Sequence, residues 1–553
     1  MLYTYINEKT MGSKTLLKQF ELRLNDGEKV GFIGRNGTGK TTLLRVISGL
    51  DKDFDGTLEI PKNAVVMATL QEHHGLGHIT TLDYVSSRLP KFAELKHIID
   101  TYPETMGEST HKQTIFADSL QEFSDKGYYE IENEIESLLD SYQLPREFLE
   151  REFATLSGGQ KRLIDLIAIQ IGNPSVALLD EPTNHMDYIA KEQFLGWLRT
   201  TTCSCIVISH DRDVLKVVNR VIELRDQKSY SFVGNYDAYL AQNSVKTVGL
   251  MQSFETTEKR IENIHEQIRY AKIKAGSKAG GNTGKSGKNS WVVLQERLKK
   301  ELDEIMKYHE KPSFWIDRES ADKLSPKVTE KYEKYKAKNI KLRHVDDQTT
   351  GILLDVSKLS LGYNSKPLFE DISFQLRPGE KLHIIGRNGA GKTTLVKAIV
   401  DTTLGIRPET LIGKGIITVS RELRLSLYEQ ELGDTLLGLT LYGAVEEIYG
   451  ERGVAVNDQA IRQVLSQYLF EPAADSQTPV NQLSGGQKAR LQLIRLLAGS
   501  PNLLILDEPT NHLDLPSIEE LENALLKYTG AIIYISHDSY FAKNVGGSSL
   551  KLG

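Results

Sequence analysis

The chain has 553 residues, of which 39% are hydrophobic, and a formal net charge of −6 at pH 7. This length favours several domains with packed cores, and no apolar run reaches the ~18 residues that a membrane-spanning helix needs. The first ten residues, MLYTYINEKT, lack the features of a signal peptide, and Cys203 and Cys205 are too few for a disulfide framework or a metal site. We therefore expect a cytoplasmic protein without a membrane segment.

One set of motifs occurs twice in the same order, in a first repeat (1–240) and a second repeat (346–553) separated by a linker (241–345). From LSGGQ to the histidine of ISHD is 54 residues in both copies. Upstream, 85 residues separate Gln71 from LSGGQ in the first repeat, whereas 53 separate Gln430 from LSGGQ in the second. Solenoid repeats have periods of roughly 20–50 residues, so this much longer period indicates duplicated whole domains.

The segment GRNGTGKTT at 34–42 matches a phosphate-binding loop. It follows the apolar strand 30–33 and precedes a helical stretch at 41–50, and a glycine-rich structural turn is the alternative. Glycines let backbone N–H groups converge on phosphate oxygens at a helix N-terminus. We predict that Lys40 reaches the terminal phosphates and that Thr41 holds Mg²⁺. The other predicted nucleotide-binding residues are Gly34, Arg35, Asn36, Gly37, Thr38, Gly39 and Thr42.

Polar residues follow several strands of the first repeat. The apolar strand 176–181 ends in Asp180, predicted to orient Mg²⁺, and Glu181, predicted to act as general base on the attacking water. His210 ends another strand and can bond the terminal phosphate or the water, and Gln71 can reach metal or water. Helix capping by the acids and a plain core histidine are the alternatives. LSGGQ at 156–160 opens a helix and predicts a second anion site, made by Ser157, Gly158 and Gly159.

The linker has two apolar stripes at helical spacing, Phe254 to Ile268 and Leu294 to Ile305, around a Gly- and Lys-rich segment at 275–290. We expect two antiparallel helices with a flexible basic tip. Residues 269–300 hold nine Lys or Arg and one acid, a net charge of +8, so the rest of the chain carries −14. A basic projection on an acidic protein favours contact with a polyanion, and a solvated charged hairpin is the alternative. Trp291 could stack on RNA or fasten the second helix.

The second repeat carries the same residue types at the same kinds of position. Its predicted nucleotide-binding residues are Gly386, Arg387, Asn388, Gly389, Ala390, Gly391, Lys392, Thr393, Thr394, Ser484, Gly485 and Gly486. Thr393 and Asp507 are the predicted Mg²⁺ ligands, and Glu508, His537 and Gln430 the predicted catalytic residues.

With these motifs in both halves, the chain resembles the ATP-binding-cassette superfamily. The resemblance implies an α/β fold of two cassettes that pack head to tail, so that LSGGQ of one closes on ATP held by the other. Ser484 and Gly486 would then close on the 34–42 site, and Ser157 and Gly159 on the 386–394 site, within one monomer. Both sites keep every motif residue, which implies hydrolysis at both, with ATP shifting the protein between open and closed states.

Members of this superfamily often stack adenine on an aromatic residue before the phosphate-loop strand. Tyr363 fits that role in the second repeat, although a plain strand-end tyrosine is the alternative. Alignment places Met11 at the equivalent position of the first repeat, where Tyr3 or Tyr5 could replace it.

The runs EPTNHMD at 181–187 and EPTNHLD at 508–514 resemble the ABC-F branch of the superfamily. The resemblance implies a ribosome-binding ATPase that enters the tRNA exit site and contacts rRNA and the P-site tRNA through residues 269–300. Some ABC-F members carry an arm within the first cassette, and we expect the extra residues within 72–155 to form no arm or a rudimentary one.

Several functions stay open from the sequence. A translation factor and an antibiotic-resistance factor that protects the ribosome fit the resemblance equally. The ATPase subunit of a membrane transporter is the main alternative, although its tandem cassettes need only a short connection. A DNA-repair or chromosome-structuring ATPase would show zinc-ligand cysteines or very long coiled coils, and neither is present.

Overall fold

The structure is a computed structural model. It describes residues 2–12, 14–69, 78–105, 107, 109–184, 186–276, 285–307, 314–335, 351–363, 366–408, 410, 415–428, 433–468, 470, 472–483, 485–511 and 513–552. The chain forms two compact units, one made of Met1–Tyr236 with Asn339–Gly553 and the other of Asp237–Lys338. The domain limits expected at 240 and 345 stay predictions, since 345 falls outside the described residues. No helix in the described ranges is long and apolar enough to cross a bilayer.

The first repeat is built on a six-stranded sheet with the order β5-β6-β7-β3-β8-β9. Its strands are β3 (Lys29–Gly34), β5 (Val66–Ala68), β6 (Val176–Asp180), β7 (Ser204–Ile208), β8 (Arg220–Arg225) and β9 (Lys228–Val233). All neighbours are parallel except β8 and β9. Strands β6 and β7 are buried throughout, as expected for apolar strands covered on both faces. A separate antiparallel sheet holds β1 (Leu2–Met11) between β2 (Lys14–Leu24) and β4 (Asp55–Glu59).

The second repeat follows the same plan. Its parallel sheet has the order β14-β15-β16-β12-β17 and its antiparallel sheet the order β11-β10-β13. The strands are β10 (Leu354–Tyr363), β11 (Lys366–Leu376), β12 (Lys381–Gly386), β13 (Ile416–Val419), β14 (Leu425–Tyr428), β15 (Leu503–Asp507), β16 (Ala531–Ile535) and β17 (Ser548–Leu552). Both repeats are therefore α/β domains, as predicted.

Helices pack against these sheets and form the hydrophobic cores with them. Each phosphate loop joins a central strand to a helix, β3 to α1 (Lys40–Ile47) and β12 to α13 (Lys392–Thr403). The other helices of the first repeat are α2 (Thr81–Arg88), α5 (Ile131–Ser141), α6 (Gly158–Gly172), α7 (Tyr188–Thr200) and α8 (Arg212–Val217). Those of the second are α14 (Asp434–Leu437), α15 (Leu441–Glu451), α16 (Asp458–Gln467), α17 (Pro472–Asp475), α18 (Gly485–Leu497), α19 (Leu515–Lys527) and α20 (Ser539–Val545).

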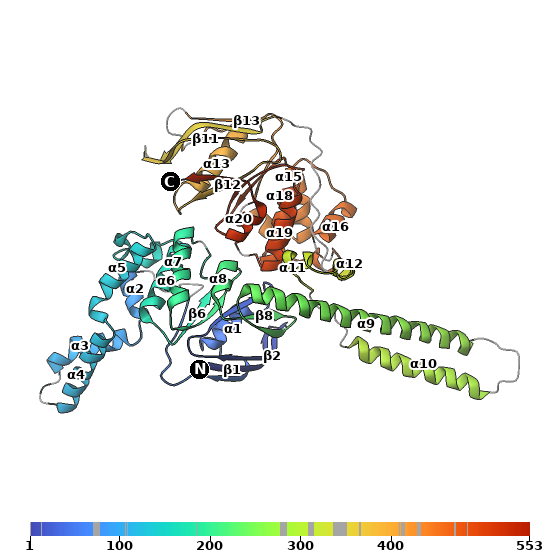
Figure 1. The fold of residues 1–553 in the computed structure, drawn as a ribbon, viewed down its shortest axis with the longest axis horizontal. Coiled ribbons are helices and arrows are strands. Elements are labelled where there is room, and N and C mark those ends of the chain that lie inside the picture. Colours follow the sequence, from blue (N-terminus) through green and yellow to red (C-terminus); the bar gives the residue numbers. More distant parts are fainter. Residues whose placement is uncertain are drawn as a thin grey trace. The chain divides into compact units, whose positions relative to one another are not determined.

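The extra residues of the first repeat fold into a pair of helices, α3 (Phe92–Thr105) and α4 (Thr110–Asp125), that lie side by side (Figure 1). The Phe92 ring centroid lies 5.5 Å from that of Phe123 and 5.2 Å from that of Tyr128, which fastens the pair to the domain. The sequence favoured an absent or rudimentary arm, and the structure shows helices of 14 and 16 residues at this place. The pairing depends on contacts between aromatic rings that are distant in sequence, such as Phe92 and Phe123, so the local sequence does not reveal it.

The second unit is a helical hairpin followed by two short helices. The long helix α9 (Tyr236–Gly276) runs antiparallel to α10 (Lys285–Met306), in agreement with the prediction (Figure 1). Ile264, Ala271 and Leu298 are buried between them, and Arg260 Nη2 lies 2.6 Å from Glu301 Oε1. The chain then returns through α11 (Arg318–Asp322) and α12 (Pro326–Tyr335), where Tyr332 joins a buried cluster with Met251 on α9. The centre of the predicted basic tip, 277–284, lies outside the described residues.

Candidate active site

The two phosphate loops hold their lysines in the same way. Lys40 Nζ donates to the carbonyl oxygens of Gly34 at 2.6 Å and Arg35 at 3.1 Å. Lys392 Nζ donates to those of Gly386 at 2.7 Å and Arg387 at 3.0 Å. The glycine before each lysine has a left-handed backbone, with φ of 94° at Gly39 and 91° at Gly391, where a side chain would be strained. Each ammonium group is therefore held inside a loop whose backbone suits phosphate.

A hydroxyl and a carboxylate lie together beside each loop. Thr41 Oγ1 donates to Asp180 Oδ2 at 2.9 Å, and Thr393 Oγ1 donates to Asp507 Oδ2 at 3.0 Å. No group of three or more His, Cys, Asp or Glu side chains in the described ranges could hold a metal by itself. Mg²⁺ commonly binds one or two protein oxygens, substrate phosphates and water. A paired threonine and aspartate therefore fit an ion that binds together with the nucleotide.

Each predicted general base contacts the predicted histidine of its own repeat. Glu181 Oε1 lies 3.5 Å from His210 Nε2, and Glu508 Oε1 lies 3.4 Å from His537 Nε2. The second carboxylate oxygen accepts from the histidine backbone N–H at 3.3 Å in both repeats. Both glutamates have a φ of 47°, a conformation that costs of order 1–3 kcal/mol and occurs mainly at functional sites. The structure thus repeats a strained arrangement of glutamate and histidine.

The pKa values of these groups are shifted towards neutral forms. Burial, reinforced by Asp507, raises the pKa of Glu508 to about 7, and burial also raises the pKa of Glu181. Burial, reinforced by Lys392, lowers the pKa of His537 to about 4, and burial with Lys40 lowers the pKa of His210. A carboxyl group with a pKa near neutrality suits proton abstraction from water. Neutral imidazoles beside it can share hydrogen bonds with water or phosphate.

The LSGGQ segment of the first repeat faces the phosphate loop of the second. Ser157 caps α6, its Oγ accepting from the backbone N–H of Gln160 at 3.3 Å. Ser157, Gly158 and Gly159 line a cleft of about 1220 Å³ together with Lys392 and Glu508. Arg387, Asn388, Gly389, Thr393, Asp507 and His537 line the same cleft. The same cleft therefore contains the phosphate loop and general base of the second repeat and the LSGGQ segment of the first.

Two aspartates, to which the sequence analysis gave no role, connect the repeats. Asp187 Oδ2 accepts from the backbone N–H of Asn388 at 3.1 Å, and Asp514 Oδ2 accepts from that of Asn36 at 3.2 Å. Each also caps a helix of its own repeat, α7 or α19. The available signal was the shared final aspartate of EPTNHMD and EPTNHLD, which looks like a plain helix cap.

Some predicted residues are not brought into this arrangement. Gln71, Gln430 and Ser484 lie outside the described residues, and Gly485 is the first residue of α18. Tyr363 ends β10 and is 56% exposed, and Met11 ends β1 and is 70% exposed. The hairpin pairs Met11 with Lys14 and Tyr363 with Lys366 make the two positions equivalent, as the alignment indicated.

Known proteins are similar to this chain over most of its length. The family profile described as "ABC transporter" matches residues 17–184 and again 369–511. The chain is 29% identical to ABC transporter F family member 2 of Arabidopsis thaliana, over 96% of this chain and 73% of that protein. It is 28% identical to the energy-dependent translational throttle protein EttA of Mycobacterium tuberculosis (strain CDC 1551 / Oshkosh), over 96% of this chain and 88% of that protein.

A solved structure shares the fold. The archaeal ribosome recycling factor aABCE1, solved in complex with the ribosomal stalk protein aP1, superposes with a TM-score of 0.56. The match covers 99% of this chain and 87% of that chain at 15% sequence identity.

Proposed function

This chain belongs to the ABC-F branch of the ATP-binding-cassette family and hydrolyses ATP, and we propose that it does so while bound to the ribosome. In this proposal it enters the tRNA exit site in its ATP-bound, closed state and contacts rRNA and the P-site tRNA through residues 269–300. It works in the cytoplasm as a monomer whose two repeats pair with each other.

We infer the following roles at each site. Lys40 and Lys392 bind the terminal phosphates, Glu181 and Glu508 accept a proton from the attacking water, and His210 and His537 hold the phosphate or the water. Both ring nitrogens of His210 and Oε1 of Glu508 are buried and have no hydrogen-bond partner among the described residues. Such groups cost free energy unless a ligand or water satisfies them.

Magnesium fits beside the same groups. Thr41 with Asp180, and Thr393 with Asp507, would hold Mg²⁺ directly or through water, and the ion would neutralise charge on the phosphates when bound. The adenine of the second site would stack on Tyr363. In each site the LSGGQ segment of the other repeat would cover the nucleotide.

The basic hairpin between the repeats carries the ribosomal part of the proposal. Each helix of the hairpin carries three cationic side chains within two helical turns. They are Arg269, Lys272 and Lys274 on α9 and Arg297, Lys299 and Lys300 on α10. Tyr270 is 55% exposed among them, and its ring meets Trp291 edge-on with centroids 5.9 Å apart. Trp291 therefore fastens the two helices together, one of its two predicted roles. A basic surface with exposed aromatic rings is typical of RNA contacts.

Sedimentation with 70S ribosomes tests this proposal. The variant with both Glu181→Gln and Glu508→Gln should bind ATP without hydrolysing it and pellet with ribosomes when ATP is present. Adding Arg297→Gln, Lys299→Gln and Lys300→Gln should weaken binding and make it less sensitive to salt, because fewer phosphates would be neutralised.

A matched control removes three positive charges from the surface of the two repeats instead of from the hairpin. Lys62→Gln, Lys228→Gln and Lys366→Gln remove three exposed lysines from the two repeats and should leave pelleting as it was. The proposal fails if the ATP-trapped protein stays in the supernatant, or if the two sets of substitutions weaken ribosome binding equally.

Two further experiments separate a transporter subunit, an antibiotic-resistance factor and a translation factor. Co-purification with a membrane partner would favour the transporter alternative. If expression raises the minimal inhibitory concentrations of lincosamides, pleuromutilins or phenicols, the protein protects ribosomes from antibiotics, and if none changes it acts as a translation factor.

A further inference from the structure

The two ATP sites share most contacts, which makes their differences informative. From LSGGQ onward, adding 327 to a residue number of the first repeat gives its equivalent in the second, so His210 corresponds to His537. The glutamate-to-histidine contacts and the aspartate contacts across the repeats agree between the two sites to within 0.1 Å. Because these contacts match so closely, a contact found at only one site marks a real difference between the two sites.

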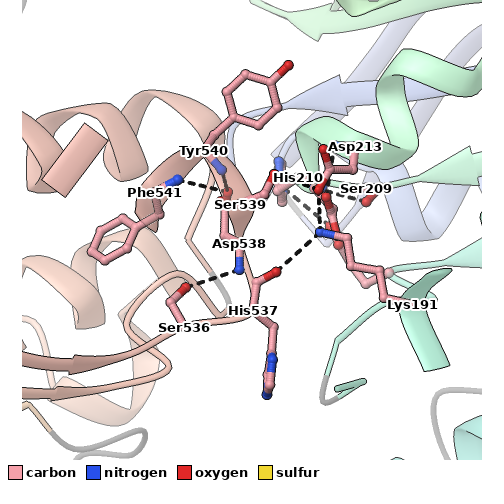
Figure 2. A network of polar contacts seen from close by, with 12 residues as sticks. Lys191, Ser209, His210, Asp213, Ser536, His537, Asp538, Ser539, Tyr540 and Phe541 are labelled. Atoms are coloured by element: carbon pink, nitrogen blue, oxygen red, sulfur yellow. Dashed lines mark hydrogen bonds and ion pairs between the residues drawn. The ribbon is translucent and has the colours of Figure 1, made fainter. Parts of the chain in front are cut away.

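Lys191 makes such a contact. It lies on α7, one turn after Asp187, and its Nζ donates to the backbone carbonyl oxygen of His537 at 3.3 Å. The same Nζ forms ion pairs with Asp211 Oδ2 at 2.9 Å and Asp213 Oδ2 at 2.7 Å (Figure 2). The lysine thus links the loop after β7 of its own repeat to the histidine of the other.

The first site has no equivalent of this lysine. The residue that corresponds to Lys191 in the second repeat is Ile518, whose side chain is buried in the hydrophobic core of that repeat. An isoleucine side chain has no hydrogen-bond donor to offer the carbonyl oxygen of His210. Among the described residues, this hydrogen bond to the histidine carbonyl oxygen is therefore found only at the second site. The loop after His210 is held differently, by the ion pairs of Asp211 with Lys191 and of Arg212 with Glu522.

The lysine is charged and fixed in place. Burial alone would lower the pKa of Lys191, but Asp211 and Asp213 raise it above its usual range. Its side chain is 8% exposed, so solvent competes little for its hydrogen bonds. A buried charge with two carboxylate partners holds one geometry more firmly than an exposed one.

A second contact holds the same loop. Ser539, two residues after His537, donates from Oγ to Asp213 Oδ2 at 2.8 Å. Lys191 and Asp213 of the first repeat therefore bind the residues on either side of Asp538 in the second, His537 and Ser539 (Figure 2). The backbone of His537 is fixed by the opposite repeat, while its ring faces Glu508.

We propose that Lys191 is a positioning residue for ATP hydrolysis at the second site, because it holds His537 in register with Glu508 only while the repeats are closed. Hydrolysis at the second site then depends on closure through this lysine, and hydrolysis at the first site does not. The inference rests on the proposed role of His537.

The test compares Lys191→Met in two backgrounds, without ribosomes. Glu181→Gln leaves turnover to the second site, and Glu508→Gln leaves it to the first. We expect Lys191→Met to lower kcat about tenfold in the Glu181→Gln background, with KM for ATP little changed, because misplacement of a catalytic group acts on the chemical step. The loss should be several times smaller in the Glu508→Gln background. Lys191→Arg should restore most of kcat, since it keeps the charge and a donor.

Controls separate positioning from general damage. Glu192→Gln, at the next and exposed position of α7, should leave both backgrounds unaffected. If Lys191→Met does not fold, Ser539→Ala is the alternative. It removes the hydrogen bond to Asp213 and should lower kcat in the Glu181→Gln background alone. Equal losses in both backgrounds, no loss in either, or absence of turnover in the Glu181→Gln protein would each overturn the proposal. Because ribosome pelleting is a separate measurement, failure here leaves the ribosomal proposal standing.

Discussion

Arg212 of the first repeat forms a buried ion pair with Glu522 of the second, with 2.8 Å between Nη1 and Oε1. The two side chains are only 4% and 6% exposed. Glu522 also accepts from Asn544 Nδ2 at 2.8 Å, and the Tyr540 ring lies 5.5 Å from the guanidinium carbon of Arg212. The buried charge of Arg212 is therefore balanced by a carboxylate of the other repeat.

Removing one member of this pair should open the protein. Among the described residues, Arg212→Met leaves the buried Glu522 with Asn544 as its one remaining partner, which should cost the closed state about 3 kcal/mol. We expect the ATP-trapped variant to become more extended, as measured by small-angle scattering with ATP. The double variant Arg212→Met with Glu522→Met should recover much of the closed population, because neither charge is then left unpaired. If the double variant is as open as the single one, the pair is not what limits closure.

Turnover at the second site should depend on pH near neutrality. Glu508 must be deprotonated to act as base, and its pKa is raised to about 7. A group with that pKa is mostly protonated one unit below it, so kcat of the Glu181→Gln protein should fall about tenfold from pH 8 to pH 6. A flat profile over this range would contradict the assignment of Glu508 as base.

The same shift predicts a pH-dependent effect on stability. The folded protein favours neutral Glu508, so the contribution of this group is fully present below its ordinary pKa of 4.5 and is lost as the pH rises through about 7. Glu508→Gln mimics the neutral form. It should therefore raise the melting temperature relative to the parent at pH 8 and much less at pH 5, as measured by calorimetry.

The sequence predicted those parts of the site that depend on a short stretch of chain. The loops around Lys40 and Lys392, and the strands that end in Asp180 and Asp507, follow from glycine spacing and apolar runs. It could not predict which aspartate or lysine reaches the other repeat, because that depends on how two domains pack. Lys191 and Glu522 read as ordinary polar positions on amphipathic helices, and nothing local marks them as interface residues.

Nucleotide affinity should differ between the sites because Tyr363 and Met11 differ. Aromatic stacking contributes about 0.5–1.5 kcal/mol beyond burial, so Tyr363→Ala should raise the Kd for ATP about two- to tenfold at the second site. Tyr363→Trp should leave the Kd for ATP at the second site unchanged, and Met11→Tyr should lower the Kd for ATP at the first site. Fluorescent ATP analogues in single-site variants would measure this. An unchanged Kd in Tyr363→Ala would identify Tyr363 as a plain strand-end residue.

Asp187 should affect closure more than folding, because its two carboxylate oxygens have different partners. Oδ1 accepts from the backbone N–H of Ala190 and caps α7, whereas Oδ2 accepts from Asn388 of the other repeat. Asp187→Ser keeps a capping hydroxyl but loses the second oxygen, and Asp187→Ala loses both. We expect Asp187→Ser to melt close to the parent, and Asp187→Ala to lose about 1 kcal/mol more, the usual value of a helix cap.

Both Asp187 variants should need more ATP to close, because each lacks the contact with the opposite phosphate loop. The control is Asp317→Ser, which changes a cap of α11 formed by Asp317 and Ser320 alone. That variant should leave the ATP dependence of closure unchanged. If Asp187→Ser closes at the same ATP concentration as the parent, the contact with Asn388 is a consequence of closure and does not stabilise it.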